Sequence, residues 1–432
     1  MKDNSSLLKI FSSRKTIALL FLGFSSGLPF YLTGQTLQAW LTKEGISLGA
    51  IGLFSLVKLP YSLKFLWSPL VDRYVPPFLG RRRGWLVITQ VALLLMIALM
   101  ASQRPSQGVQ VLAVIAFIVT FLSASQDIVV DAYRTDVLEA TERGPGTSVY
   151  LIGYRVAILT TFSLALFLAS IMPWQGVYLF MSLLMLVGVV STLLAPEPPL
   201  RDHPPQSLYG AVTLPFIDFF QRHGSVQAIL ILLFIMIYKL GDSLLKNVSI
   251  PFLLAKGLHF TEQDLALPNA LGIFAVIVGT SVGGAVIAKI GINRSLWIFA
   301  ILQAVGNLSY FALAVVGKNF PLMVLAINIE NLCYGLESVA FVVFLMSLCT
   351  QGFSATQFAL LSSLQAFSRD ILTAPAGAWA EATGWSWFFL LTAIAALPGL
   401  LLLPMFAPWN PQPAGIPRPG LDDEEQDLWG KK

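Results

Sequence analysis

Apolar segments long enough to cross a lipid bilayer recur along most of this sequence. A hydrocarbon core of about 30 Å needs roughly 20 apolar residues in a helix. Twelve predicted spans cover residues 15–40, 47–69, 85–102, 109–133, 146–170, 174–195, 226–254, 265–288, 294–316, 320–349, 355–381 and 385–407. With 56% hydrophobic and only 12% charged residues among 432, a soluble globular protein is excluded. The expected fold is therefore an all-α membrane protein with twelve transmembrane helices.

The basic residues outside these spans predict the orientation. If the N-terminus is cytoplasmic, seventeen lysines and arginines lie on that side and four on the other. Positively charged loops stay in the cytoplasm, so both termini are expected there. The net charge of +4 then reflects topology and gives no reason to expect nucleic acid as a partner.

A Pro-rich stretch, "PEPPLRDHPPQSLYG" at 196–210, cannot continue a helix and divides the spans into two sets of six. The predicted organisation is an N-terminal half at 1–195, a cytoplasmic linker at 196–222, a C-terminal half at 223–407 and a disordered cytoplasmic tail at 408–432. Two parallel six-helix halves are typical of the major facilitator superfamily, in which the substrate site lies between the halves.

The loop after the second span, "DRYVPPFLGRRRG", combines an acidic residue with a basic cluster. A weaker copy, "AKIGINRS", follows the eighth span and has Ala288 in place of the acid. In the major facilitator superfamily such a loop helps to latch the inner gate. We therefore expect a gate role for the residues of the first copy, namely Asp72, Arg73, Arg81, Arg82 and Arg83.

Charged residues inside the spans are costly unless they are paired or face a polar cavity. Six are basic: Lys58, Lys64, Arg155, Lys239, Lys246 and Arg369. Seven are acidic: Asp127, Asp131, Asp242, Glu330, Glu337, Asp370 and Glu381. This number predicts a polar cavity between the helices.

The fourth span ends in "SASQDIVVDAYR", which places Asp127 and Asp131 four residues apart on one helix face. Asp131 and Arg134 lie near the predicted cytoplasmic end, where we expect gate ion pairs. Arg155 is assigned to the same gate group, with Asp131 or Glu142 as its partner.

Two features of the C-terminal half indicate transport chemistry. Lys239, Asp242 and Lys246 form one stripe in the seventh span, although Lys239 and Asp242 could also neutralise each other. Glu330, like Asp127, has no opposite charge within one turn of its own helix. A carboxylate in this position needs a partner from another helix, a cation or a proton, so the proton-coupling candidates are Asp127, Glu330 and Asp242.

Long motifs of the chain resemble the AmpG muropeptide permeases. They include "SSGLPF", "TLQAWLTKEGI", "KFLWSPLVDRY", "PPFLGRRRGWL", "SASQDIVVDAYRTDVL", "YKLGD", "ENLCYG" and "FSATQFALLSS". The resemblance implies a bacterial inner-membrane permease that imports GlcNAc-1,6-anhydro-MurNAc and its peptides for peptidoglycan recycling. It also implies proton symport, and a contribution to β-lactam resistance where such a circuit exists.

A sugar that carries a peptide needs amide, aromatic and cationic side chains around it. The substrate-binding candidates are Gln35, Gln38, Tyr61, Gln126, Tyr154, Lys239, Lys246, Asn331, Gln365 and Arg369. The expected partners are this glycopeptide, protons and the lipid bilayer, and the chain is expected to act as a monomer without metal or cofactor.

Other functions are possible from the residues alone. A related eukaryotic carrier family transports acetyl-CoA, so another bulky anionic solute is the alternative substrate. A membrane enzyme is disfavoured because the three histidines lie in or beside loops and form no metal-ligand cluster. A non-transporting sensor is disfavoured as well, and a flux assay would distinguish it from a carrier.

Overall fold

The computed structural model describes residues 13–47, 54–105, 108–199, 205, 207–254 and 258–406, and regular structure in these ranges is helical. In the N-terminal part the helices are α2 (Arg14–Leu32), α3 (Gln35–Lys43), η1 (Phe54–Lys58), α5 (Leu59–Leu63), η2 (Lys64–Leu66), α6 (Ser68–Arg73), α7 (Arg81–Ala101), α8 (Val109–Val137), α9 (Arg143–Leu159), η4 (Thr160–Leu164), α10 (Ala165–Ile171) and α11 (Trp174–Leu194). They are followed by α12 (Leu208–His223), α13 (Ser225–Ile237), α14 (Leu240–Leu253), α15 (Glu262–Ile290), α16 (Ile292–Val316), α17 (Phe320–Leu348), η5 (Gln351–Phe353), α18 (Ser354–Thr373), α19 (Ala376–Thr383), α20 (Trp385–Ile394) and α21 (Leu397–Phe406).

Ten segments of the described chain are long and apolar enough to cross a membrane. The expected second and eleventh spans are helical too, but each is broken into shorter pieces. The second runs through η1, α5, η2 and α6 and contains Pro60 and Pro69, which cannot donate a helical hydrogen bond. The eleventh consists of α18 and α19, separated at Pro375. Ten of the twelve expected spans are thus confirmed by the length and composition of the described helices.

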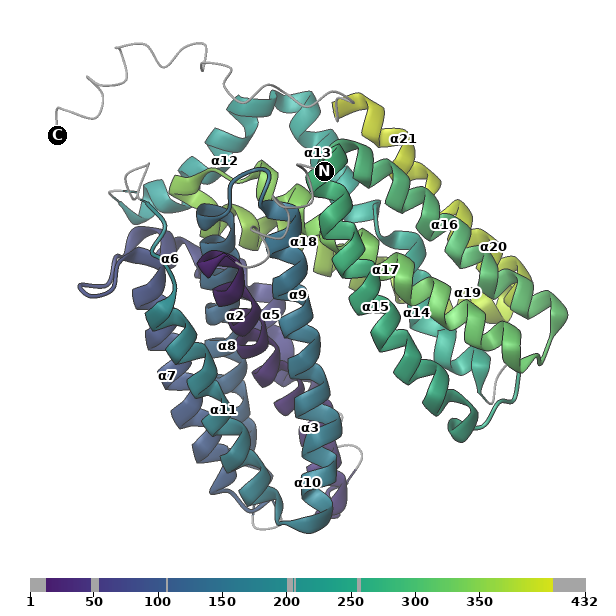
Figure 1. The fold of residues 1–432 in the computed structure, drawn as a ribbon, viewed down its shortest axis with the longest axis horizontal. Helices are drawn as coiled ribbons and strands as arrows, with labels where there is room; N and C mark the ends of the chain where they lie inside the picture. The colour runs from purple at the N-terminus through teal and green to yellow at the C-terminus, as the bar shows by residue number, and fades with distance from the viewer. Residues whose placement is uncertain are drawn as a thin grey trace.

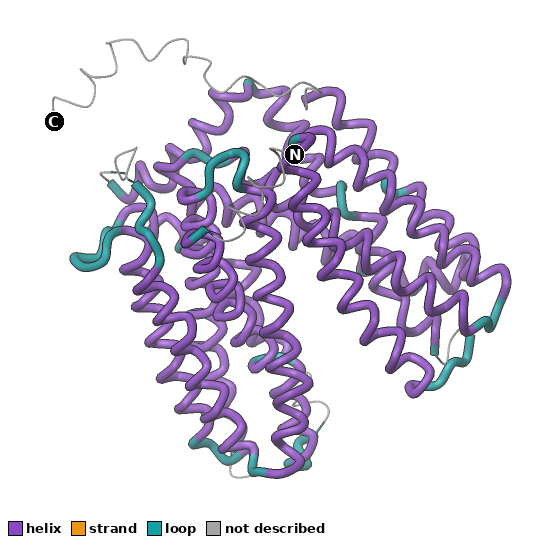
Figure 2. The backbone as a smooth tube through the Cα atoms, viewed as in Figure 1, coloured by secondary structure: helices purple, strands orange, loops and turns teal. Residues whose placement is uncertain are grey.

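The helices form two bundles that meet at one end and diverge at the other (Figures 1 and 2). Helices α2 to α11 make the first bundle and α13 to α21 the second, with α12 crossing between them. We call the end near α12 the closed end and the opposite one the open end. The domain boundaries expected from the sequence remain predictions.

The two bundles touch most closely where α9 crosses α15. A Cβ atom on Gly144 would lie 2.6 Å from the carbonyl oxygen of Gly284, and one on Gly284 would lie 2.6 Å from Oγ of Ser148. Only glycine allows the two backbones to approach this closely. The crossing therefore depends on small residues on both helices.

Helix α13 stops at Ile237 and α14 starts at Leu240, so Tyr238 and Lys239 form a break within one apolar segment. The side chain of Tyr238 is buried and its hydroxyl donates to the carbonyl oxygen of Leu296 at 3.0 Å, which anchors the break. Broken helices in transporters line binding sites because their irregular backbone is tolerated only beside protein or a polar cavity.

Candidate functional site

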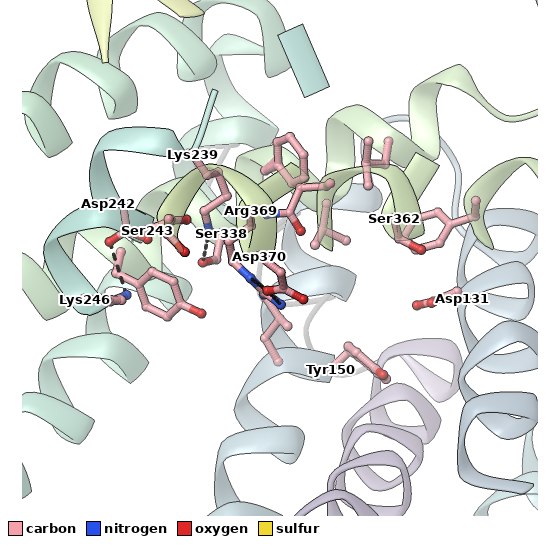
Figure 3. A pocket seen from close by; sticks show the side chains of 18 of the residues that line it. Asp131, Tyr150, Lys239, Asp242, Ser243, Lys246, Ser338, Ser362, Arg369 and Asp370 are labelled. Atoms are coloured by element: carbon pink, nitrogen blue, oxygen red, sulfur yellow. Dashed lines mark hydrogen bonds and ion pairs between the residues drawn. The ribbon is translucent and has the colours of Figure 1, made fainter. Parts of the chain in front are cut away.

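A cavity of about 550 Å³ lies between the bundles and is lined by both. The first bundle contributes Asp131, Arg134, Tyr150, Leu151 and Arg155. The second bundle contributes Lys239, Asp242, Ser243, Lys246, Asn247, Tyr334, Ser338, Phe341, Val342, Leu345, Phe358, Ser362, Gln365, Arg369, Asp370 and Thr373. Figure 3 shows Asp131 and Tyr150 on one side and Lys239, Asp242 and Lys246 on the other.

The wall formed by the first bundle carries a compact ion cluster. The guanidinium of Arg134 donates to Asp131 at 2.8 Å, and Lys64 reaches the other oxygen of Asp131 at 3.4 Å. Arg134 also lies over the rings of Tyr150 and Phe358, at 4.4 and 5.5 Å from their centroids. Because Phe358 belongs to α18, this cluster contacts both bundles.

Lys246 is the centre of the ion pairs in the second bundle. Its Nζ lies 3.2 Å from Asp242 and 3.2 Å from Glu330. Gln303 from α16 donates to the same carboxylate of Asp242 at 3.4 Å. Glu330 therefore has the partner from another helix that its isolated position required.

Lys239 takes a separate set of partners. Its Nζ donates to Oγ of Ser338 at 3.1 Å and lies 3.8 Å from the carboxylate of Glu337. The alternative in which Lys239 and Asp242 neutralise each other is therefore wrong, because each lies against a different opposite charge.

Tyr334, which the sequence analysis did not select, lies among three cations. Its ring centroid is 2.8 Å from Nζ of Lys246, 4.6 Å from Nζ of Lys239 and 5.4 Å from the guanidinium carbon of Arg155. The sequence signal was its place in "ENLCYG", one turn from Glu330. Nothing else in the sequence indicates that an isolated tyrosine in an apolar span lies among three cations.

Arg155 does not make the ion pairs expected for it. Asp131 is paired with Arg134, and Glu142 is paired with Lys15 at 3.0 Å. Arg155 lies instead in the cavity wall, over Tyr334. The physical reason is its position more than three helical turns from Glu142 along α9, where it reaches the other bundle.

The substrate-binding candidates fall into two groups. Lys239, Lys246, Gln365 and Arg369 line the cavity, whereas the other six are not among its lining residues: Gln35, Gln38, Tyr61, Gln126, Tyr154 and Asn331.

Members of the second group have other contacts. The amide of Gln126 donates to the hydroxyls of Ser25 and Ser26 at 3.3 and 3.2 Å. Tyr61 donates to Ser123 at 2.9 Å, and Asn331 donates to a carbonyl oxygen of its own helix. Gln35 and Gln38 are exposed on α3.

Asp127 lies on α8, one helical turn before Asp131, and is not among the residues that line the cavity. Its Oδ1 is buried and accepts no hydrogen bond from any residue that the structure describes. No lysine or arginine of the described chain lies within 4.0 Å of its carboxylate. The side chain is half-buried in a membrane-spanning helix, where a carboxylate without a cation is costly as an anion.

At the closed end, Asp72 connects the two bundles. Its Oδ1 accepts from Arg81 at 2.9 Å and from Arg82 at 3.1 Å. The backbone N–H and the hydroxyl of Thr356, at the start of α18, donate to Oδ2 at 2.7 and 2.8 Å, and the backbone N–H of Ala355 reaches Oδ1 at 3.3 Å. The N-terminus of α18 thus holds a carboxylate of the other bundle, as helix N-termini favour.

The cluster around Asp72 has a second carboxylate that the sequence analysis missed. Asp136 accepts from Nε of Arg82 at 2.7 Å, and its backbone oxygen accepts from Gln351 of the second bundle at 3.0 Å. Asp136 follows Asp131 by five residues and so lies on a different face of α8. The periodicity used for Asp127 and Asp131 could not find it.

The remaining two basic residues of this loop do not bridge the bundles. Arg83 donates to the backbone oxygens of Thr192 and Leu193, and Arg73 donates to that of Pro205. Glu197 in turn accepts from the backbone N–H of Arg83 at 3.0 Å. These contacts hold the loop against the end of α11 and the segment that follows it.

The described residues include no cluster of histidine, cysteine, aspartate and glutamate with the arrangement of a metal site. Cys333 and Cys349 are free thiols.

Comparison with known proteins agrees with this architecture. The family model described as Major Facilitator Superfamily matches residues 19–373. The anhydromuropeptide permease of Escherichia coli K12 is 47% identical over 402 residues, which cover 93% of this chain and 81% of that protein. Two solved structures share the fold: the proton:xylose symporter XylE (TM-score 0.67, 13% identity, 94% and 97% of the two chains) and FucP in the outward conformation (TM-score 0.67, 13% identity, 91% and 98%). This chain is a multi-pass membrane transporter that belongs to the major facilitator superfamily and, within it, to the AmpG family of permeases.

Proposed function

We propose that this protein imports GlcNAc-1,6-anhydro-MurNAc and its peptides across the bacterial inner membrane for peptidoglycan recycling. The observation that carries the proposal is the cation-rich cavity between the bundles, in a chain 47% identical to an anhydromuropeptide permease. Its volume of about 550 Å³ is within the usual range for small-ligand sites, roughly 300–1,000 Å³.

The cavity lining suits a solute that is both polar and acidic. Lys239, Lys246 and Arg369 supply cations, and Gln365 supplies an amide for hydroxyl and acetamido groups. Tyr150 adds an aromatic face of the kind that packs against a sugar ring. Anhydromuropeptides present hydroxyls, acetamido groups and carboxylates, so each part of the solute has a matching side chain.

The arrangement of the bundles supports alternating access. With both termini and the linker in the cytoplasm, as the basic residues favour, the closed end is the cytoplasmic end. The cavity then faces the periplasm, and the ion cluster of Asp72 with Arg81 and Arg82 holds the cytoplasmic side shut. Import follows when this cluster separates and the bundles close at the other end.

Among the three carboxylates considered for proton coupling, Asp127 is the strongest candidate. Asp242 and Glu330 each lie within 4.0 Å of Lys246, whereas no lysine or arginine of the described chain lies within 4.0 Å of Asp127. We expect Asp127→Asn, which mimics the protonated form, to abolish proton-driven accumulation while exchange of solute across the membrane continues. Glu330→Gln is the matched control, and it should retain accumulation.

Counterflow and proton-driven uptake of labelled anhydromuropeptide into proteoliposomes test the function. We expect uptake that a pH gradient accelerates and that excess unlabelled anhydromuropeptide suppresses. If acetyl-CoA competes and anhydromuropeptide does not, the chain carries the alternative bulky anion. If Asp127→Asn accumulates solute normally, the coupling role passes to Asp242 or Glu330.

A further inference from the structure

Five cations line the cavity, and they differ in one respect. Arg134, Lys239, Lys246 and Arg369 each have a carboxylate within 4.0 Å. Arg155 has none within the part of the chain that the structure describes, although it lies in a membrane-spanning helix where an unpaired charge is costly.

The carboxylates near Arg155 pair with other cations of the cavity wall. Glu330 and Glu337 are 4% and 1% exposed and are not among the lining residues, so they lie behind the two lysines. Asp242 is 3% exposed and is engaged by Lys246 at 3.2 Å. Asp242, Glu330 and Glu337 are therefore engaged by the two lysines, and Asp370 is engaged by Arg369. The guanidinium of Arg155 is left without a carboxylate partner among the residues described.

Tyr334 holds this guanidinium in place. The ring lies within cation–π distance of Arg155 from α9 and of both lysines of the second bundle. Three cations from two bundles thus meet around one ring. Arg155 is the one among them that has no carboxylate within 4.0 Å among the described side chains.

We infer that Arg155 binds a carboxylate of the transported solute and that Tyr334 is the residue that positions it. This inference rests on the proposed function and specifies which part of the solute is recognised there. Arginine suits the task because its planar fork donates two parallel hydrogen bonds to one carboxylate. The free lactyl carboxylate of GlcNAc-1,6-anhydro-MurNAc, or a peptide carboxylate, is a group of this class.

The test uses two solutes of equal size that differ in one charge: GlcNAc-1,6-anhydro-MurNAc with its free lactyl acid, and the corresponding primary carboxamide. Uptake into proteoliposomes is measured as half-saturation and maximal rate for each. We expect the wild-type protein to favour the acid by about 10- to 100-fold in half-saturation, the size of a lost charged hydrogen bond. Arg155→Gln should abolish this preference by weakening only the acid, and Arg155→Lys should retain part of it.

The role of Tyr334 is tested with two substitutions, one that keeps its aromatic ring and one that removes it. Tyr334→Phe keeps the aromatic face and should keep the preference for the acid, whereas Tyr334→Leu should raise the half-saturation for the acid and leave the maximal rate nearly unchanged. Arg222→Gln is the control for loss of a charge, because Arg222 is paired with Asp218 on α12, away from the cavity. Membrane abundance and thermal stability are recorded for each variant.

The outcomes separate this inference from the proposed function. If the wild-type protein carries neither compound, the proposed function fails and the inference fails with it. If it carries both without preference, or if Arg155→Gln still prefers the acid, the inference alone is overturned. A preference that depends on Lys246→Gln rather than on Arg155→Gln would move the carboxylate to the lysine and overturn it as well.

Discussion

Replacement of Asp72 by asparagine should open the closed end of the transporter. Asp72 is fully buried and accepts five hydrogen bonds, three of them from Ala355 and Thr356 in the other bundle. Every partner is a donor, so the amide nitrogen of an asparagine would face a donor whichever way the side chain turned. The substitution removes the negative charge and at least part of the contact with α18.

The size of the effect follows from these contacts. A hydrogen bond to a charged group stabilises by about 1.5–3 kcal/mol, and a buried donor left without a partner costs about 1–3 kcal/mol. Asparagine can keep one oxygen toward α18, so we take the loss between the bundles as about 2–4 kcal/mol. The equilibrium should shift by about 30- to 1,000-fold toward the state in which the closed end separates.

Spin labels on the two bundles can measure this shift. Glu139 in the first bundle and Lys289 in the second are exposed near the crossing of α9 and α15. Labels at these two positions, in a protein with Cys333 and Cys349 replaced by alanine, report the distance across the closed end. We expect a short distance in the parent and a substantial longer component in the Asp72→Asn variant.

The control removes a carboxylate that does not join the bundles. Asp264 caps the start of α15 by accepting from the backbone N–H of Thr261 at 2.9 Å. Asp264→Asn should leave the distance across the closed end unchanged. Identical distance distributions for the parent and the Asp72→Asn variant would show that Asp72 does not hold the bundles together.

Three further predictions concern topology, the site and the crossing. A cysteine at Ser207 should resist membrane-impermeant reagents added outside intact cells, because the linker is expected in the cytoplasm, and external labelling would refute that topology. Lys239→Ala should reduce uptake more than Lys256→Ala at equal membrane abundance, since Lys239 lines the cavity, while Lys256 lies outside the described residues and is expected in an external loop. Gly144→Val or Gly284→Val should destabilise the closed end by roughly 1–3 kcal/mol through overpacking, seen as a longer distance between the same two spin labels.

The membrane-spanning segments could be predicted from the sequence because lipid imposes a simple demand. Each helix must satisfy its own backbone and present about 20 apolar residues, and ten described segments meet this demand. Where a segment is surrounded by other helices, its backbone need not form one continuous helix. The predicted second span, 47–69, is formed from Phe54 onward by short helical pieces, none of which is long enough to cross a membrane by itself.

The partners of the charged residues were harder to predict, since spacing places residues on a helix face but does not identify the opposite helix. The stripe of Lys239, Asp242 and Lys246 was predicted to face a polar interior, and all three line the cavity. The partner of Lys239 lies on α17, almost one hundred residues away in the sequence. No pattern within α13 or α14 contains that information.

The two aspartates Asp72 and Asp127 show why some buried charges hold the structure together and others are available for transport. Both oxygens of Asp72 are met by donors from two bundles, so this group lowers the energy of one arrangement and changes partners only when the bundles move. Asp127 and Arg155 lie in the same bundle, and neither has an opposite charge within 4.0 Å among the described side chains. A proton would neutralise the carboxylate of Asp127, and a carboxylate of the solute would give Arg155 an opposite charge. An anion bound at Arg155 would also attract a positive charge to that bundle by Coulomb's law, and this attraction gives a physical reason for solute and proton to cross the membrane together.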